Sequence, residues 1–329
     1  MESPNTLLEA LQYFSDEQVC IDTVASMRWM NGPVCPECDA ASPYYLKTQK
    51  RWKCRECRIQ FSVKRGSIFE DSPISLSKWL PALWLLVNCK NGVSSYEVAR
   101  DLGVTQKSAW FMLQRLRLAL RSRNFSSKMG SADGAGVEVD ETYIGGNPLK
   151  MHKERRLKLA QARSKTVKAV DRYPGKATVM GLFDRESRQV RAKVVPNVKR
   201  ETLQNEILAN VERGSAIYSD QAVAYDKLAQ NYIHETVSHA DCYVRGQVHT
   251  NCLENFWSLT KRTLRGTYVA VEPFHLDRYL DEQMFRFNNR ATKDNPLTDS
   301  DRFLLALSQV ADRRLTYKEL TGKVSTTGA

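Results

Sequence analysis

Two Cys-x-x-Cys pairs constrain this chain more than any other feature of its sequence. The stretches "CPEC" and "CREC" place Cys35, Cys38, Cys54 and Cys57 at the spacing C-x2-C-x15-C-x2-C. Two such turns can bring four thiolates into a tetrahedron around Zn²⁺, with each sulfur about 2.3 Å from the metal. A redox dithiol is the alternative, but two matched pairs flanked by "RWK" and "RIQF" favour a ribbon. Because four thiolates leave no open position for water, we expect structural zinc.

The remaining composition indicates a soluble, globular, cytoplasmic protein. The chain has 329 residues, enough for two or three domains, and its hydrophobic content is 42%. The longest apolar patch, "WLPALWLLV", is shorter than the roughly 18 residues that span a bilayer, so we expect no membrane partner. The N-terminus is acidic and amphipathic, unlike a secretory signal. In a reducing compartment, the cysteines outside the two pairs are expected to be buried thiols. They are Cys20, Cys89, Cys242 and Cys252.

The charge balance favours a polyanionic partner. Lys and Arg number 49 against 37 Asp and Glu, which gives a formal net charge of +12. Such an excess is typical of nucleic-acid-binding proteins, although a merely basic surface would show it too.

Pattern and composition divide the chain into a series of expected segments. These are an N-terminal helical segment (1–30), a zinc ribbon (31–73), a helical DNA-binding region (74–122), a linker (123–135), a catalytic domain (136–292), and a C-terminal helix with a disordered tail (293–329). Within 136–292, the predicted order is three strands, helix, strand, helix, strand, helix, which indicates a mixed α/β sheet. The segment 148–176 interrupts this order with ten Lys or Arg and two acids. We expect that segment to be a loop, or a helix that orders on a partner.

A helix-turn-helix is predicted in the stretch "SSYEVARDLGVTQKSAWFMLQRLR". Ser94 or Ser95 can cap a first helix, Gly103 suits a tight turn, and Thr105 can cap a second helix. The second helix would expose four polar side chains to DNA. They are Gln106, Lys107, Ser108 and Arg115. An ordinary helical hairpin is the alternative.

The stretch "VEVDETYIGG", residues 137–146, combines acidic residues with the alternation of a core strand. Because successive side chains of a strand point to opposite faces, Asp140 shares a face with Glu138, while Glu141 points away. We therefore interpret Asp140 as a candidate metal ligand, Glu138 as a further possible one, and Glu141 as structural.

Two further carboxylates can converge with Asp140. Asp220 ends a predicted strand, and Glu254 lies in the first turn of a predicted helix. Three such carboxylates at one sheet edge repel one another unless they hold divalent cations such as two Mg²⁺ or Mn²⁺ ions. Solvated surface acids are the alternative. Lys261 follows Glu254 by two helical turns and could contact a phosphate, and Arg262 and Arg265 continue this basic side toward DNA.

Several stretches together resemble successive motifs of a bacterial insertion-sequence transposase family. They are "VCPEC", "WKCREC", "LGVTQKSAWFMLQRLR", "VEVDETYIGG", "HTNCLENFWSLTKR" and "GTYVAVEPFHLDRYLDEQMFRFNNR". The family is the zinc-ribbon DDE class (ISXO-type), related to eukaryotic Merlin elements, and the resemblance covers roughly residues 15–292. It implies a zinc ribbon, a helix-turn-helix and an RNase H-like domain. The implied DDE residues are Asp140, Asp220 and Glu254, with Lys261 as a basic fourth member. Gln221 departs from the family, which often has an acid there.

The resemblance implies a magnesium-dependent DNA transposase. Such an enzyme would bind the terminal inverted repeats of an insertion sequence, cleave phosphodiesters at its ends, and join the 3′-hydroxyls to target DNA. Its partners would be double-stranded DNA and at least one more copy of the chain, because two ends must be paired, and it would be associated with the nucleoid. One alternative is a non-enzymatic zinc-ribbon and helix-turn-helix regulator with an inactive catalytic domain. A simple nuclease without strand transfer is another.

Overall fold

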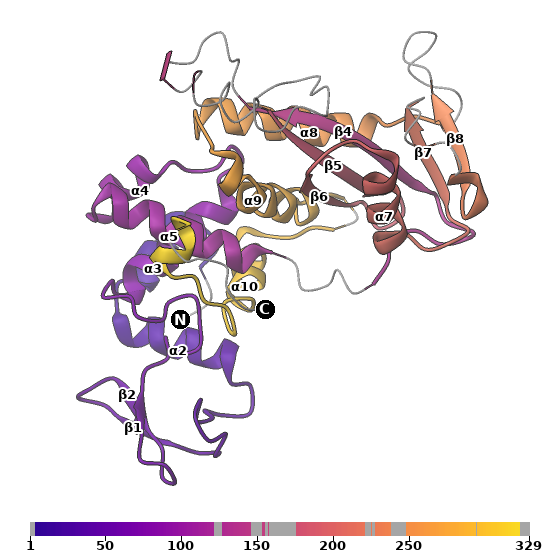
Figure 1. The fold of residues 1–329 in the computed structure, drawn as a ribbon. Helices are drawn as coiled ribbons and strands as arrows, with labels where there is room; N and C mark the ends of the chain where they lie inside the picture. The colour runs from indigo at the N-terminus through magenta and orange to yellow at the C-terminus, as the bar shows by residue number, and fades with distance from the viewer. Residues whose placement is uncertain are drawn as a thin grey trace. The chain divides into compact units, whose positions relative to one another are not determined.

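The chain forms two compact units in the computed structural model (Figure 1). Unit 1 comprises Met1–Arg121 together with Asn289–Ala329, and unit 2 comprises Ser122–Asn288. The structure describes residues 4–121, 127–145, 153–154, 157, 176–220, 225, 228–237, 248–293 and 295–322. Within these ranges, no helix is both long enough and apolar enough to cross a membrane.

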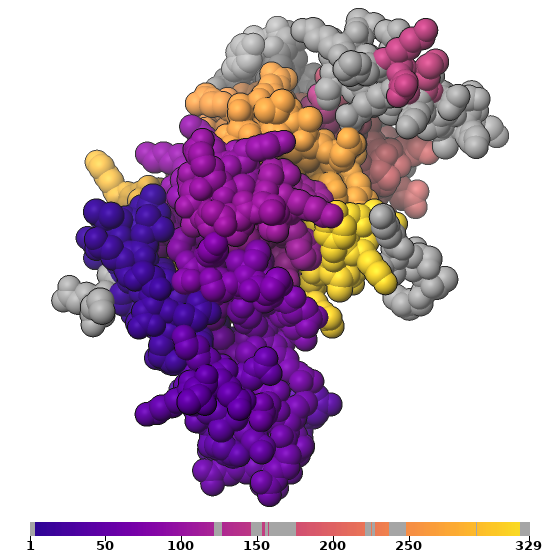
Figure 2. All heavy atoms as spheres, turned by 90° about the vertical axis from the view of Figure 1, so that its left-hand side faces the viewer, coloured from indigo at the N-terminus to yellow at the C-terminus, as the bar shows by residue number. Residues whose placement is uncertain are grey.

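The ribbon of unit 1 is a small antiparallel sheet. Its strands follow one another in the order β1 (Tyr44–Leu46), β2 (Arg51–Lys53) and β3 (Gln60–Phe61). Strands this short bury little surface, and aromatic side chains form part of their core. Trp52 is buried, and its ring lies 4.7 Å from that of Tyr45 and 5.1 Å from that of Trp29, measured between centroids. In the space-filling view, the ribbon forms a purple lobe beneath the helices of unit 1 (Figure 2).

Helices make up the rest of unit 1. They are α1 (Leu7–Tyr13), α2 (Glu17–Arg28), α3 (Leu76–Asn88), α4 (Ser95–Leu102), α5 (Gln106–Leu120), α10 (Asp299–Leu307) and α11 (Tyr317–Leu320). The apolar patch "WLPALWLLV" belongs to α3, where all but one of its residues are buried, so α3 is a core helix. Its N-cap, Ser75, makes no side-chain cap hydrogen bond. Instead, the carboxylate of Glu17 accepts hydrogen bonds from the backbone N–H groups of Leu76 and Ser77, both at 3.1 Å.

The C-terminal segment completes the core of unit 1. Phe303 in α10 is buried, and its ring centroid lies 5.3 Å from those of both Phe14 and Trp84. Further along, Ile68 donates a backbone hydrogen bond to the carbonyl of Val310 at 3.0 Å. Residues far apart in the sequence therefore share one core. Residues 323–329 of the tail that is expected to be disordered lie outside the described residues.

Unit 2 is built on one mixed five-stranded sheet with the order β6-β5-β4-β7-β8. Its strands are β4 (Val137–Ile144), β5 (Ala177–Asp184), β6 (Gln189–Val195), β7 (Ala216–Asp220) and β8 (Ile233–Val237). The first three pair antiparallel, and β7 and β8 add parallel to β4. This arrangement confirms the expected RNase H-like mixed α/β sheet. The helix expected between the last two strands is, among the described residues, only the 3-10 turn η4 (Leu228–Gln230).

Helices pack on both faces of this sheet. One face and α7 (Arg200–Asn210) share a core that includes Val137, Val139 and Leu203. The opposite face is covered by α8 (Asn251–Gly266) and α9 (Leu276–Asn288), whose buried side chains form a second core. Side chains of α9 also accept hydrogen bonds from backbone N–H groups of the edge strand β6. These bonds run from Val190 to Asn288, from Ala192 to Met284 and from Val194 to Asp277. The edge is thereby closed to further strands.

Candidate active site

The acidic strand β4 alternates as its sequence predicts. Val137 and Val139 lie in the core shared with α7, and the carboxylate of Glu141 on that face accepts a hydrogen bond from the hydroxyl of Tyr225. Asp140 is on the other face, where the indole Nε1 of Trp257 donates to its Oδ2 at 3.0 Å. Asp140 and Glu141 therefore meet different elements, although they are adjacent in the sequence.

Asp220 is the last residue of β7, the strand that pairs in parallel with β4. The parallel register pairs Glu138 with Tyr218. Continuing that register by two residues brings Asp140 beside Asp220, the last residue of β7, with both side chains on the face covered by α8. The third carboxylate, Glu254, is exposed in the first turn of α8.

The three carboxylates influence one another electrostatically. The pKa of Asp140 is raised from its ordinary value of 3.8 to about 6, mainly because the carboxyl is buried. The hydrogen bond from Trp257 opposes this rise, and the negative charges of Asp220 and Glu254 contribute to it. A carboxyl with a raised pKa beside two other acids is typical of a functional site. This environment disfavours the ionised form of Asp140, and a bound cation would reverse that preference.

A glycine lets α8 come close to the acidic strand. Gly181 on β5 pairs directly with Asp140. A Cβ atom at this position would lie 2.5 Å from Cζ2 of Trp257 and 3.0 Å from Cδ2 of Leu253. No side chain larger than hydrogen fits there without displacing α8. The absence of a side chain at Gly181 therefore lets the indole of Trp257 reach Asp140.

Basic residues follow Glu254 along α8. Lys261 is partly buried, which lowers its pKa, while the nearby charge of Asp140 acts in the opposite direction. The ammonium of Lys261 therefore interacts electrostatically with the carboxylate of Asp140. Arg262 and Arg265 are exposed near the C-terminal end of α8, with Arg265 in its last turn, and they extend a positive surface.

Glu141 has the structural position expected of it. The pKa of its carboxyl is raised from 4.5 to about 7, mainly because the group is buried. The hydrogen bond from Tyr225 opposes this rise, and the charges of Asp140 and Asp220 contribute to it. Tyr225 itself is fully buried in the core shared with α7. Because that contact lies on the far face of the sheet, Glu141 faces away from Asp140.

Glu138 shares the face of Asp140, and both of its carboxylate oxygens have partners within the protein. Its Oε2 accepts the backbone N–H groups of Cys252 at 3.0 Å and Leu253 at 3.2 Å. Its Oε1 lies 2.8 Å from Nε of Arg185 and 3.3 Å from Nδ1 of His249. These contacts assign Glu138 to the start of α8 and to Arg185, and its possible role as a metal ligand stays a prediction. His249 is a satisfied histidine within the same network.

The donor chemistry of the acidic set fits a hard divalent cation. Asp140, Asp220 and Glu254 offer carboxylate oxygens, the ligands that Mg²⁺ prefers. Their packing is looser than that of the cysteines, since across the described ranges the four thiols are the one group of potential ligands within 4.8 Å of one another. Mg²⁺ commonly keeps several waters and uses one or two carboxylates, so a looser set suits it.

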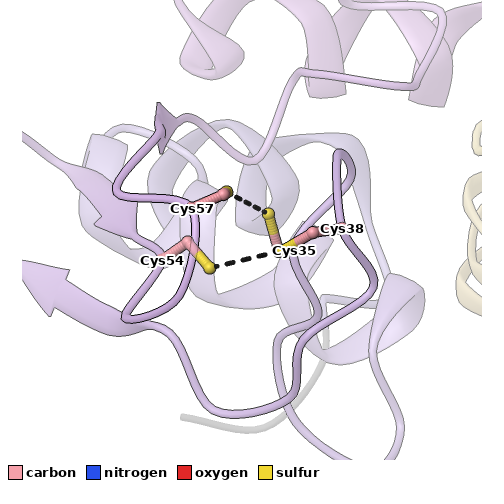
Figure 3. A group of neighbouring side chains, drawn as sticks. All are labelled: Cys35, Cys38, Cys54 and Cys57. Carbon is pink, nitrogen blue, oxygen red and sulfur yellow. Dashed lines mark hydrogen bonds between the residues drawn. The ribbon is translucent and has the colours of Figure 1, made fainter.

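The four cysteines of the ribbon lie together as their spacing predicts (Figure 3). Their sulfur atoms are all within 4.8 Å of one another, and the pairs Cys35–Cys57 and Cys38–Cys54 are each separated by 3.6 Å. Tetrahedral zinc with sulfur at about 2.3 Å places its ligands about 3.8 Å apart. Desolvation opposes ionisation of Cys54, but the N–H groups of Cys57 and Glu56 outweigh it and lower its pKa to about 7. The cluster is consistent with structural zinc.

The predicted helix-turn-helix forms with the predicted caps. Ser94 and Glu97 make a capping box at the start of α4, and the hydroxyl of Thr105 accepts the N–H of Ser108 at the start of α5. Gly103 between them has the left-handed conformation, φ 59° and ψ 49°, which favours glycine. These features support two helices joined by a tight turn.

The exposure expected for the second helix holds only at its start. Lys107 is exposed, and its Nζ lies 4.9 Å from the centroid of the Tyr317 ring. Gln106 and Ser108 are half-buried, and Gln106 donates to the hydroxyl of Ser95 at 2.9 Å. The expectation for Arg115 was wrong, since it is only 3% exposed.

Contacts inside unit 1 explain the burial of Arg115. Its Nη2 donates to the carbonyl of Glu70 at 2.6 Å, and its guanidinium lies over the rings of Trp79 and Phe111. Arg115 therefore joins α5 to α3 and to the loop after the ribbon instead of facing solvent. Apart from its residues 153, 154, 157 and 176, the basic segment 148–176 lies outside the described residues, as do Gln221 and Cys242.

Two family models match the parts of the chain that carry these sites. Residues 131–288, which include the three acids, match the model of the ISXO2-like transposase domain. Residues 15–60, which include the four cysteines, match the model of a transposase zinc-ribbon domain. The chain is also similar to a protein of Halobacterium salinarum described as an uncharacterized protein in transposable element ISH50. The two are 27% identical over 279 residues, which cover 82% of this chain and 90% of that relative.

Proposed function

Because this chain belongs to the ISXO2-like transposases that carry a zinc-ribbon domain, we propose that it moves a DNA element by end cleavage and strand transfer. Family membership implies DNA binding and transposase activity. The finer steps rest on the site. One observation supports them: β4 and β7 pair in parallel with Glu138 beside Tyr218, a register that leads to Asp140 and Asp220 on adjacent strands, and burial together with the charges of Asp220 and Glu254 raises the pKa of Asp140.

In this proposal, Asp140, Asp220 and Glu254 hold two Mg²⁺ or Mn²⁺ ions. Such ions, when bound, activate the attacking water or 3′-hydroxyl and stabilise the leaving oxygen of the phosphodiester. Lys261 contacts the phosphate beside the acids, and Arg262 and Arg265 hold the neighbouring DNA backbone. The protein contributes positioning and electrostatic stabilisation, with no covalent protein intermediate.

Unit 1 supplies end recognition in the same proposal. The ribbon, folded around zinc, and the start of α5 with Gln106, Lys107 and Ser108 bind the terminal inverted repeats. The catalytic domain at 136–292 then acts on the ends. Two copies of the chain pair the two ends, so a dimer or a larger assembly forms on DNA.

The decisive experiment compares two neighbouring variants on a labelled end fragment. Asp140→Asn should abolish Mg²⁺-dependent cleavage while gel-shift binding to the fragment is retained, because binding depends on unit 1. Glu141→Gln, its control, should keep most of its activity, since it faces the other side of the sheet. Cleavage by Asp140→Asn, or complete inactivity of Glu141→Gln alone, would contradict the proposed site.

The same assay separates the two alternatives. A non-enzymatic regulator would bind the end fragment but never cut it at any concentration of Mg²⁺. A simple nuclease would cut the fragment without joining it to a target plasmid. Products in which the labelled 3′ end is joined to the plasmid are the result expected of a transposase.

A further inference from the structure

The helix that carries Glu254 and Lys261 lacks a local cap. The N-cap residue of α8, Thr250, has φ −119° and ψ 21° and makes no side-chain cap hydrogen bond. The first N–H groups of a helix otherwise need partners, and an N-cap side chain commonly accepts from the second or third residue. In α8, these residues are Cys252 and Leu253.

A distant carboxylate takes the place of that cap. Oε2 of Glu138 accepts from both Cys252 and Leu253, although Glu138 and Cys252 are 114 residues apart in the sequence. Glu138 is completely buried. Its negative charge also lies at the positive end of the α8 dipole, where it is favourable. The start of α8 is thus fixed directly to β4.

Arginine holds this carboxylate in place. Nε of Arg185 donates to Oε1 of Glu138 at 2.8 Å, and Nη2 donates to the carbonyl of His249 at 2.7 Å. The guanidinium of Arg185 also lies 4.2 Å from the centroid of the Tyr218 ring on β7. One cation therefore joins the strand of Asp140, the strand of Asp220 and the residues that lead into α8.

The same helix and strand are joined a second time. Trp257, one turn after Glu254, donates to Asp140, and Gly181 gives its indole the room to do so. Glu254 lies between the two attachments, three residues before Trp257 and two after Cys252. Its distance from Asp140 is therefore set by Glu138 on one side and Trp257 on the other.

We infer that Glu138 is a positioning residue of the active site. It fixes the first turn of α8 so that Glu254 and Asp140 can hold the same divalent cations. This inference rests on the proposed function, because it assigns Glu138 a role in a metal site formed by those acids. Residues that orient metal ligands commonly change metal affinity or activity by about 10–100-fold when they are replaced.

The test variant is Glu138→Gln, which keeps the shape but removes the charge. Its matched control is Asp184→Asn. Asp184 is also a buried carboxylate that accepts backbone N–H groups, but these belong to Gly130 and Glu186 and not to α8. Both changes should lower the melting temperature of the full chain. Only Glu138→Gln should weaken metal binding.

Metal binding is measured with Tb³⁺, whose luminescence is excited through the indole of Trp257 beside Asp140. We expect the half-saturating Tb³⁺ concentration to rise about tenfold in Glu138→Gln and to stay unchanged in Asp184→Asn. The Mg²⁺ concentration for half-maximal end cleavage should rise in parallel, while gel-shift binding to the end fragment is unchanged. Arg185→Lys is a milder variant that keeps the charge but loses the forked contact. It should also raise the half-saturating Tb³⁺ concentration and the Mg²⁺ concentration for half-maximal cleavage.

Three results would overturn the inference in distinguishable ways. If Glu138→Gln and Arg185→Lys bind Tb³⁺ as the parent does, Glu138 has no positioning role. If Asp184→Asn shows the same tenfold loss, the effect is a general loosening of unit 2. If the Tb³⁺ signal of the parent persists in Asp140→Asn, the acidic metal site itself fails, and the proposed function fails with it.

Discussion

Replacing Asp140 with Asn should stabilise unit 2 at pH 7.5 when no divalent cation is bound. At this pH, the carboxyl is ionised in a site that disfavours its charge, because burial, together with the charges of Asp220 and Glu254, raises its pKa to about 6. Asn removes the charge and keeps an oxygen that can accept the indole N–H of Trp257. The variant should therefore relieve repulsion without leaving the indole unpaired.

The size of the effect follows from the two pKa values. The change from 3.8 to about 6 corresponds to about 3 kcal/mol, at about 1.4 kcal/mol per pH unit. Asp140 retains some solvent contact, and screening reduces the expected gain in the free energy of unfolding to about 1–3 kcal/mol. For a domain of this size, a gain near 2 kcal/mol raises the melting temperature by about 4–8 °C.

The pH dependence has a definite sign. The folded pKa of Asp140 lies above its unfolded value, so the protonated carboxyl contributes stability that is fully present below about pH 4. This contribution is lost as the pH rises toward about 6. Parent and variant should therefore have nearly equal melting temperatures near pH 4, and their melting temperatures should differ most at pH 7.5. The ionisation of Glu141, whose pKa is about 7, also changes the stability of both proteins with pH. This contribution largely cancels when the two melting temperatures are subtracted.

Thermal unfolding of parent and variant at pH 4 and pH 7.5 measures this difference. The buffer should lack Mg²⁺ and also any chelator, so that zinc stays in the ribbon. Asp184→Asn is the control, and it should lower the melting temperature at pH 7.5. A melting temperature of Asp140→Asn below that of the parent at pH 7.5, or an equally large gain at pH 4, would contradict a charge penalty at Asp140. Adding Mg²⁺ should stabilise the parent and not the variant.

Three further outcomes are expected. Cys54→Ser should lose zinc by metal analysis and destabilise the ribbon while unit 2 melts unchanged, and stoichiometric zinc in the variant would contradict the four-thiol site. Replacing Arg262 and Arg265 with Ala should reduce the slope of log affinity for DNA against log salt by about 2, whereas an unchanged slope would mean that neither residue contacts phosphate. Gly181→Ala should cost about 1–3 kcal/mol in urea unfolding, because its Cβ would lie 2.5 Å from Trp257, and a variant of parental stability would rule out that close approach.

Local patterns in the sequence were sufficient for much of the fold. Alternation predicted that Asp140 and Glu141 face opposite sides of β4, and the cysteine spacing predicted the four-thiol cluster. Capping chemistry located the turn at Gly103. Each of these features depends on backbone geometry over a few residues, or on a spacing that one type of metal site requires.

Long-range partners could not be predicted in this way. Glu138 has the pattern of a metal ligand, but its acceptor positions are taken by Arg185 and by a helix start more than a hundred residues away. Arg115 lies on a helix where exposure was expected, yet the carbonyl of Glu70 and the ring of Trp79 enclose it. The identity of such partners is set by tertiary packing, on which helical periodicity alone carries no information.

The return of the chain to unit 1 has a consequence for how the protein is made. Phe303 and Val310 complete a core whose other members, Phe14, Ile68 and Trp84, leave the ribosome more than two hundred residues earlier. The core of unit 1 is therefore complete only after the last segment has been synthesised, whereas the sheet of unit 2 is complete before then. A gene copy truncated after codon 288 should yield a folded sheet in unit 2 and a unit 1 with an open core, so loss of the last 41 residues would destabilise unit 1 before it affects the acidic residues of unit 2.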